Sequence, residues 1–248
     1  MTGTEREGRV GLVTGGASGI GAACAGQLAR AGVRVVVADL RLDAARATAA
    51  TVDGVAVQVD VSQPDSVGSM VAHVRDRFGR LDIAVNNAGV GVPSKKRIAD
   101  MSDDDWHTVT AVNLDGVFHC LRAELPLMLR APSGGSIVNV ASVMGAVGTI
   151  GGAAYVAAKH AVVGLTRTAA LEYAADGIRV NAVGPGFVDT PLLGHQDAAL
   201  RERTAAAHPV GRLATAEEIA AVVCFLASPA SSFVTGAFYL ADGGYTAV

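Results

Sequence analysis

The sequence lacks long hydrophobic runs and lacks an apolar leader. The longest uninterrupted apolar run, residues 219–227, is far shorter than the ~20 residues that a helix needs to cross a bilayer. Residues 1–8 are polar and mixed in charge, so no signal peptide is expected there. These absences predict a cytoplasmic protein that has no membrane partner.

Cysteine is scarce, with only Cys24, Cys120 and Cys224 in 248 residues. The three positions are far apart, odd in number, and form neither a CxxC motif nor a metal-ligand spacing. Free thiols in a reducing compartment are the simplest interpretation, and no metal site is predicted.

Charge is also scarce and nearly balanced. Charged residues make up 17% of the chain, against about 25% in an average protein, and the formal net charge is -3. A nucleic-acid partner is not expected, because the chain lacks the basic excess that such binding requires. Hydrophobic residues reach 50%, which favours strands buried on both faces or a sizeable subunit interface.

A repeating pattern runs along the chain instead: short β-branched segments alternate with longer, alanine-rich ones. Because the segments expected to be strands are apolar throughout and are separated by helices, they predict a parallel sheet covered on both faces. We therefore expect one doubly wound, Rossmann-type α/β domain over residues 1–248. The expected strands are 10–14, 33–38, 55–59, 81–85, 136–141, 178–183 and 237–240. The expected helices are 19–31, 42–51, 64–78 (capped by Ser62), 103–129, 153–175 and 215–227.

Residues 186–214 interrupt this rhythm with glycine, proline and one short helical stretch. A long irregular segment late in an α/β fold is often functional. It is the candidate for a lid over the substrate.

A glycine-rich turn, TGGASGIG at residues 14–21, lies between the first strand and the first helix. Gly15, Gly19 and Gly21 allow a tight turn and let the helix N-terminus approach a pyrophosphate. Such a turn could also be a plain strand-to-helix connection. The strand before it, the helix after it and an acid at the end of the next strand favour a dinucleotide site.

That acid is Asp39, which could accept hydrogen bonds from the adenosine ribose and would repel the 2′-phosphate of NADP. A solvated strand-end carboxylate is the alternative. Arg41 complicates the choice, since an arginine nearby can bind a 2′-phosphate. The glycine turn itself holds no basic residue, so NAD is the predicted cofactor.

Tyr155 and Lys159 are four residues apart in an expected helix, which places both on one face. A tyrosine with an ordinary pKa near 10 is a poor base, and a nearby ammonium favours its ionised form. The chain has only three lysines, and the other two are adjacent in a loop. A single helical lysine beside a tyrosine therefore suggests proton transfer, for which a compact ammonium suits better than a guanidinium.

Two further polar residues are candidates by position. Ser142 follows the expected strand 136–141, and the carboxyl ends of such strands carry the sites of open α/β sheets. Its hydroxyl could bind a substrate oxygen, although a serine there is often a turn residue. Asn113 lies inside an expected helix, where its helix propensity is modest.

Taken in order, these motifs resemble the short-chain dehydrogenase/reductase family over essentially the full chain. The matching elements are TGGASGIG at 14–21, NNAG at 86–89, Asn113, Ser142, YVAAK at 155–159 and PG at 185–186. The resemblance implies that Tyr155 is the acid/base and that Ser142 orients the substrate oxygen. It implies that Lys159 holds the nicotinamide ribose and tunes Tyr155, and that Asn113 holds a water that relays protons.

The same resemblance implies a full set of cofactor contacts and an assembly. The cofactor residues are Gly15, Ser18, Gly19, Ile20, Gly21, Asp39, Leu40, Asp60, Val61, Asn87, Ala88, Gly89, Tyr155, Lys159, Pro185, Gly186, Val188 and Thr190. The substrate lid is implied over 186–210. A homotetramer is also implied, with residues 217–227 and 237–240 packed across a two-fold axis.

The substrate is less defined. Candidate pocket residues are mostly apolar and predict a hydrophobic or alicyclic alcohol or ketone: Val92, Met144, Val147, Ile150, Phe187, Leu192 and Leu193. His195, in the expected lid, reads as a surface residue. The basic run at 95–97 is either a solvated loop or an attraction for an anionic substrate or acyl carrier.

Three functions therefore stay open: an NAD-linked alcohol dehydrogenase, a 3-oxoacyl reductase using NADPH, and a non-catalytic nucleotide sensor. The sensor is disfavoured because all four candidate catalytic residues are present: Asn113, Ser142, Tyr155 and Lys159. The NADPH reductase is disfavoured by the carboxylate of Asp39.

Overall fold

The computed structural model describes residues 8–131, 134–194 and 197–247. Its centre is a seven-stranded sheet in the order β3-β2-β1-β4-β5-β6-β7, in which every neighbouring pair is parallel. The strands are β1 (Val10–Thr14), β2 (Arg34–Asp39), β3 (Val55–Gln58), β4 (Ile83–Asn86), β5 (Gly135–Val140), β6 (Ile178–Pro185) and β7 (Phe238–Ala241). The order reverses between β1 and β4, where the carboxyl ends of strands leave a crevice.

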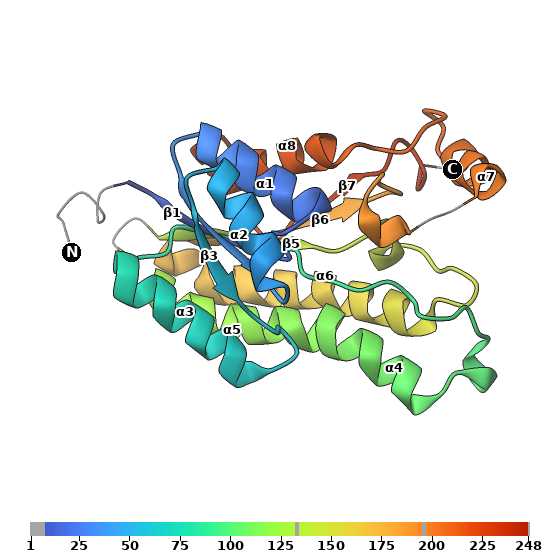
Figure 1. Ribbon diagram of the computed structural model, residues 1–248, viewed down its shortest axis with the longest axis horizontal. Coiled ribbons are helices and arrows are strands. Elements are labelled where there is room, and N and C mark those ends of the chain that lie inside the picture. Colours follow the sequence, from blue (N-terminus) through green and yellow to red (C-terminus); the bar gives the residue numbers. More distant parts are fainter. Residues whose placement is uncertain (1–7, 132–133, 195–196, 248) are drawn as a thin grey trace.

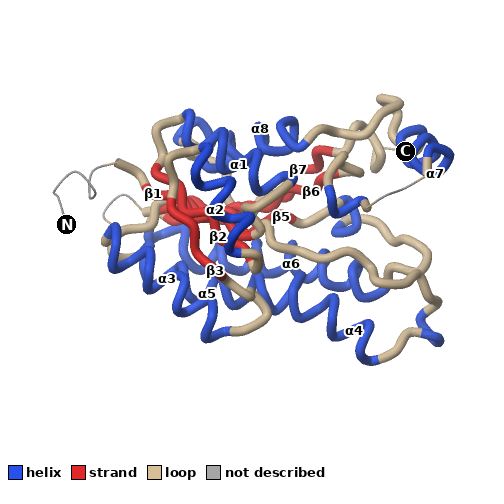
Figure 2. Tube along the Cα trace, in the orientation of Figure 1, coloured by secondary structure: helices blue, strands red, loops and turns tan. Residues whose placement is uncertain are grey.

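Helices cover both faces of this sheet (Figures 1 and 2). One layer contains α1 (Gly19–Arg30), α2 (Leu42–Thr51) and α8 (Ala216–Ala227), and the other contains α3 (Pro64–Phe78), α4 (Asp103–Thr110), α5 (Gly116–Met128) and α6 (Ala153–Tyr173). The predicted doubly wound α/β fold is thus confirmed.

The apolar strands explain the two layers. Successive side chains of a strand point to opposite faces, so a strand covered on both sides is apolar throughout. In β1, Val10 and Leu12 join the core under α3 and α5, whereas Val13 joins the core under α1 and α8. All five residues of β1 are buried.

Most expected elements lie within two residues of the observed ones, with two informative differences. The expected helix 103–129 is divided by a π-helical segment, η3 (Ala111–Asp115), between α4 and α5. Ser62 is not the N-cap of α3; Gln63 takes that position, without a side-chain cap bond. The Ser62 hydroxyl instead donates to Asp60 Oδ1 at 2.6 Å, and this local bond competes with capping.

The irregular segment after β6 has two short helices, η6 (Pro191–Leu193) and α7 (Ala198–Ala206). An isolated bridge between Val188 and Ala214 closes its base. Among the described residues, no helix is both long enough and apolar enough to cross a membrane.

Candidate active site

The glycine-rich turn is folded against the end of β4. Gly15 and Gly19 adopt positive φ of 61° and 51°, a conformation that favours glycine. A Cβ on Gly21 would lie 2.1 Å from the Gly15 carbonyl oxygen, so a side chain there would prevent α1 from starting at this point. Asn87 Nδ2 donates to the carbonyl oxygens of Thr14 and Gly15, at 3.1 Å each. The turn is therefore fixed from the neighbouring strand.

Asp39 is tied to the same turn. Its Oδ2 accepts the Ala17 backbone N–H at 3.1 Å, and its Oδ1 accepts the Arg41 backbone N–H at 3.0 Å. The Arg41 guanidinium lies 3.8 Å from Asp39 Oδ1, but its side chain is 65% exposed. The carboxylate is thus held in place by backbone donors, while the arginine that pairs with it is largely exposed to solvent.

A cavity of about 320 Å³, here called the turn cavity, opens between the glycine turn and the ends of β2, β3 and β4. Most of the predicted cofactor residues line it: Gly15, Ser18, Gly19, Ile20, Asp39, Leu40, Asp60, Val61, Asn87, Ala88, Gly89 and Thr190. Gly21 lies beneath it and does not line it. Val59, Val90, Val112 and Pro191 also line it and were not predicted. Val59 and Val90 are neighbours in the sequence of the predicted residues Asp60 and Gly89, and this position could have identified them as lining the cavity.

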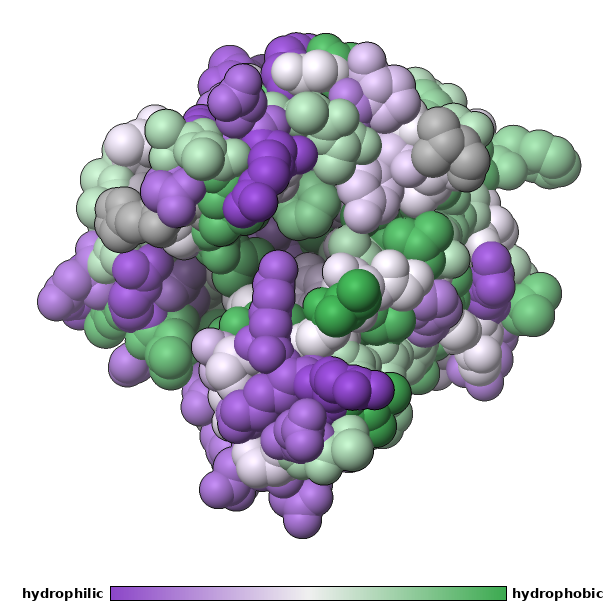
Figure 3. All heavy atoms as spheres, turned by 90° about the vertical axis from the view of Figure 1, so that its right-hand side faces the viewer, coloured by the Kyte–Doolittle hydropathy of each residue, from purple (hydrophilic) through white to green (hydrophobic). Residues whose placement is uncertain are grey.

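A second cavity of about 320 Å³, here called the tyrosine cavity, adjoins the first and shares Ile20, Asn87, Gly89, Thr190 and Leu192 with it. It brings together Asn113, Ser142, Tyr155 and Lys159, from three separate elements, together with Pro185, Gly186 and Val188. Figure 3 looks onto this end of the molecule, which is visibly hollowed.

Lys159 is buried, with 4% of its surface exposed. Its Nζ donates to the Val140 carbonyl oxygen at 2.9 Å and lies 5.6 Å from the centre of the Tyr155 ring. Burial lowers the pKa of Lys159 to about 8, so it stays mostly protonated at neutral pH. Gly89 lies beside both Asn113 and Lys159: a Cβ there would come within 2.7 Å of Asn113 Oδ1 and would be in ordinary contact with Lys159 Nζ at 3.9 Å.

Two effects shift the pKa of the Tyr155 phenol in opposite directions. Burial raises the pKa of its phenol, and a hydrogen bond with Ser142 lowers it; burial outweighs the bond. The protein groups alone therefore leave this pKa above its ordinary value, and the lowering comes from Ser142. The lowering by Lys159 that the sequence predicts stays a prediction. Ser142 itself is 9% exposed, and its Oγ accepts the Met144 backbone N–H at 3.2 Å.

Asn113 is presented by the π-helical segment, a feature often found at functional sites. Its side chain is completely buried. Nδ2 donates to the Val90 carbonyl oxygen at 2.9 Å, and Oδ1 accepts the Val90 N–H at 3.1 Å. The amide thus clamps the loop after β4, a use that the sequence did not predict.

Most of the predicted pocket residues line the tyrosine cavity: Val92, Met144, Ile150, Phe187, Leu192 and Leu193. Val147 does not line it, and His195 lies outside the described residues. The cavity also includes Lys95 from the basic run. Within the described ranges, no group of three or more His, Cys, Asp or Glu side chains could hold a metal ion.

Comparison with known proteins places these features in context. A family model described as enoyl-(acyl carrier protein) reductase matches residues 15–246. The chain is 46% identical over 244 residues to cis-4-hydroxycyclohexanecarboxylate dehydrogenase of Sinomonas cyclohexanicum, covering 97% of each chain. It is 42% identical to cyclohexanol dehydrogenase of Acinetobacter sp. (strain SE19), covering 96% of this chain and 95% of that one. The crystal structure of levodione reductase superposes with a TM-score of 0.92 at 36% identity, covering 97% of this chain and 98% of the other.

Proposed function

Because the chain belongs to the short-chain dehydrogenase/reductase family, we propose that it moves a hydride between NAD(H) and an alicyclic secondary alcohol or its ketone. One observation carries this proposal. Ser142, Tyr155 and Lys159 meet in a cavity with apolar walls, which adjoins the glycine-rich turn. The two relatives named for cyclohexane alcohols support the alicyclic substrate.

The residues present fit a dinucleotide. The turn cavity has glycine where a pyrophosphate must approach the backbone, a helix N-terminus beside it, and Asp39 at its rim. When bound, NAD supplies the hydride chemistry that side chains lack. Asp39 would hold the adenosine ribose, and Asp60 and Val61 the adenine. Residues 185–190 and Lys159 would hold the nicotinamide end.

NAD is favoured over NADP by charge. Asp39 is held by two backbone N–H groups, so it cannot easily turn away from a 2′-phosphate. Arg41 is the opposing influence, but Asp39 already lies beside its guanidinium. The same reasoning disfavours a 3-oxoacyl reductase that uses NADPH.

In the proposed mechanism, Ser142 orients the substrate oxygen and Tyr155 exchanges a proton with it. Because burial raises the pKa of Tyr155, its ionisation requires positive charge nearby. Lys159 is the cation available, with its Nζ 5.6 Å from the ring centre. Asn113 holds the loop after β4 through its two bonds to the Val90 backbone, and it lines the tyrosine cavity, where it would also hold the water of the proton relay.

We further propose that residues 1–248 act as one domain, with residues 186–210 as the substrate lid. The cytoplasm is the proposed compartment, because Cys24, Cys120 and Cys224 are all free thiols.

We propose a homotetramer as the assembly. The edge strand β7 exposes Tyr239 and Leu240, and the neighbouring α8 exposes Phe225. Apolar side chains on a sheet edge and an adjacent helix are suited to a two-fold contact. Light scattering at micromolar protein should give four times the chain mass of 25.0 kDa. A monomer under those conditions would contradict this assembly.

The test of the function is direct. The purified protein is mixed with NAD⁺ or NADP⁺ and a panel of cyclohexanols, and formation of reduced nicotinamide is followed by absorbance. We expect turnover with NAD⁺ and none in Tyr155→Phe, which should still bind NADH because only the acid/base is lost. Turnover by Tyr155→Phe, or none with any alcohol in the wild type, would contradict the proposal.

A further inference from the structure

The charged side chains that line the tyrosine cavity are all positive among the described residues. Two lysines, Lys95 and Lys159, line it, and no Asp or Glu does among the described residues. The rest of the wall is mainly apolar or small, including Met144, Ile150 and Phe187. A neutral alicyclic alcohol would match the apolar wall and would give the positive charge of Lys95 no partner.

The two lysines differ in their surroundings. Lys159 is buried and donates to a backbone carbonyl beside Tyr155, so it belongs to the proton-transfer machinery. Lys95 is exposed at the cavity's rim. No described residue forms an ion pair or hydrogen bond with its ammonium. It is therefore available to a ligand.

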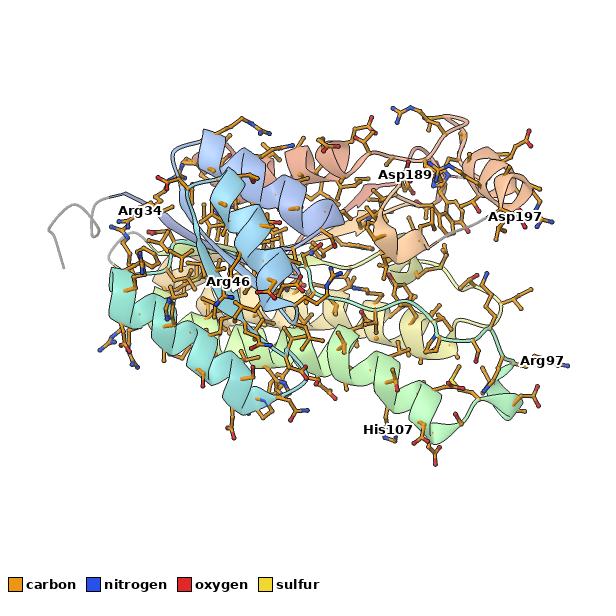
Figure 4. The ribbon with its side chains drawn as sticks, viewed as in Figure 1. Arg34, Arg46, Arg97, His107, Asp189 and Asp197 are labelled. Carbon is orange, nitrogen blue, oxygen red and sulfur yellow. The ribbon has the colours of Figure 1, made fainter. Side chains whose placement is uncertain are left out.

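The structure separates Lys95 from the two other cations of the basic run. Lys96 Nζ is paired with Asp105 Oδ2 at 2.7 Å, and Lys96 does not line the cavity. Arg97 points away from the body of the molecule into solvent (Figure 4). In the sequence the three positive charges of this run look equivalent. In the structure Lys95 lines the cavity, and Lys96 and Arg97 do not.

The backbone at Lys95 is seated against the loop that leads into α6. A Cβ placed on Gly151, which has a φ of 74°, would lie 2.8 Å from Lys95 Cβ and 3.1 Å from Lys95 Cα. This close approach needs glycine at position 151. It fixes the base of the lysine stem beside the segment that begins the helix of Tyr155, so the ammonium can reach only the part of the cavity near that base.

We infer that the substrate is an alicyclic hydroxy acid, whose carboxylate binds Lys95 while its hydroxyl lies at Ser142 and Tyr155. The inference rests on the proposed function and narrows its substrate class. The ring would occupy the apolar middle of the cavity, with polar groups at its two ends. A lysine suits this task at a rim, because its flexible stem packs along apolar surface while its charged end stays in water.

The experiment compares two substrates of similar shape: cis-4-hydroxycyclohexanecarboxylate and the neutral 4-methylcyclohexanol. For the wild type we expect kcat/KM for the acid to exceed that for the neutral alcohol by at least fivefold. Lys95→Met keeps the stem and removes the charge, so it should lower kcat/KM for the acid about five- to tenfold. The neutral alcohol should change by less than twofold.

Arg97→Gln is the matched control, since it removes one positive charge two residues away from a side chain that points into solvent. It should leave both substrates within twofold of the wild type. Lys95→Arg restores the charge and should recover most of the preference. Raising the salt concentration should reduce the preference in the wild type and not in Lys95→Met.

The outcomes separate the two proposals. If neither substrate nor any alcohol of the cyclohexanol panel is oxidised, the proposed function itself is wrong, and if only the neutral alcohol is oxidised, the role of Lys95 is overturned. If both are oxidised and Lys95→Met lowers neither or both equally, the alcohol dehydrogenase stands and the role of Lys95 is overturned. An equal loss in Arg97→Gln would also overturn it, because the effect would then come from overall charge.

Discussion

At the scale of single residues, Lys159 offers the sharpest test of the mechanism. Lys159 lines the tyrosine cavity, and its Nζ donates to the Val140 carbonyl oxygen at 2.9 Å. A guanidinium keeps the charge but needs more room and a planar arrangement of partners. We expect Lys159→Arg to lose at least a hundredfold in kcat, which is about 2.7 kcal/mol of barrier.

Steady-state kinetics over a range of pH would check this. Wild-type alcohol oxidation should rise with pH as Tyr155 loses its proton and then level off. In Lys159→Ala, any residual activity should rise at higher pH, because burial alone raises the pKa of the phenol. Near-normal turnover in Lys159→Arg, or an unmoved profile in Lys159→Ala, would rule out this role.

The second prediction for a single residue concerns Asp39 and the relative affinities for NADH and NADPH. The wild type should bind NADH at least tenfold more tightly than NADPH, a gap of about 1.4 kcal/mol. Asp39→Ala should narrow this gap by removing the negative charge and freeing the Arg41 guanidinium, which lies 3.8 Å away. Fluorescence titration with both cofactors measures it. Asp43→Ala is a suitable control, since Asp43 is exposed and pairs with Arg46. Equal affinities in the wild type would refute the preference.

Which residues line the candidate site could largely be predicted from the sequence, because they stand in a few spaced motifs. Tyr155 and Lys159 share a helix, and the glycine turn is contiguous. What could not be predicted depends on contacts between distant segments. The clamp from Asn113 to Val90 spans 23 residues, and the separation of Lys95 from Lys96 depends on where Asp105 lies.

At the scale of elements, the helix predicted over 103–129 illustrates the same limit. Its residues are helical throughout, so composition predicted the type correctly. The π-helical turn at Ala111–Asp115 inserts an extra residue, and Gly116, which directly follows it, is the one local irregularity adjoining it in the sequence. The tertiary bonds of Asn113 with Val90 compensate for the irregular backbone.

The prediction for this element concerns a substitution that removes the bonds between Asn113 and Val90. Asn113→Ala leaves both Val90 backbone groups without their partners, so we expect a loss of about 1–3 kcal/mol in the free energy of unfolding. Because Gly89 lines both cavities, NADH affinity should fall as well. Asn113→Asp keeps an acceptor for the Val90 N–H but sets an oxygen against the Val90 carbonyl in a buried site, so it should not restore the stability. Urea unfolding and NADH titration measure the two effects; unchanged values in Asn113→Ala would disprove the clamp.

At the scale of the whole molecule, a buried polar network joins the sheet to the helices beneath it. Asn86 Nδ2 donates to Glu124 Oε2 at 3.1 Å and to Asn139 Oδ1 at 3.0 Å, and Asn139 Nδ2 donates to Thr166 Oγ1 at 3.0 Å. Glu124 is completely buried, and neither its Oε1 nor Asn86 Oδ1 has a hydrogen-bond partner. The network thus lacks a donor, which a protonated carboxyl would supply.

Burial raises the pKa of Glu124 from 4.5 to about 7, and this makes stability depend on pH. Between these values the folded protein holds a proton that the unfolded chain has released. The contribution of Glu124 is therefore fully present below pH 4.5, falls as pH rises towards 7, and stays constant above it. The fall is on the order of 3 kcal/mol. Glu124→Gln is neutral at every pH and brings its own N–H donor.

We therefore expect Glu124→Gln to lose less stability than the wild type between pH 5 and pH 8, and to be the more stable protein at pH 8. Urea unfolding at both pH values measures the difference, and other titrating groups cancel when the two proteins are compared. Glu172→Gln provides the control, because the same change on an exposed residue of α6 leaves the network intact. If wild type and Glu124→Gln respond to pH identically, then Glu124 is ionised in the folded protein and the missing donor must come from elsewhere.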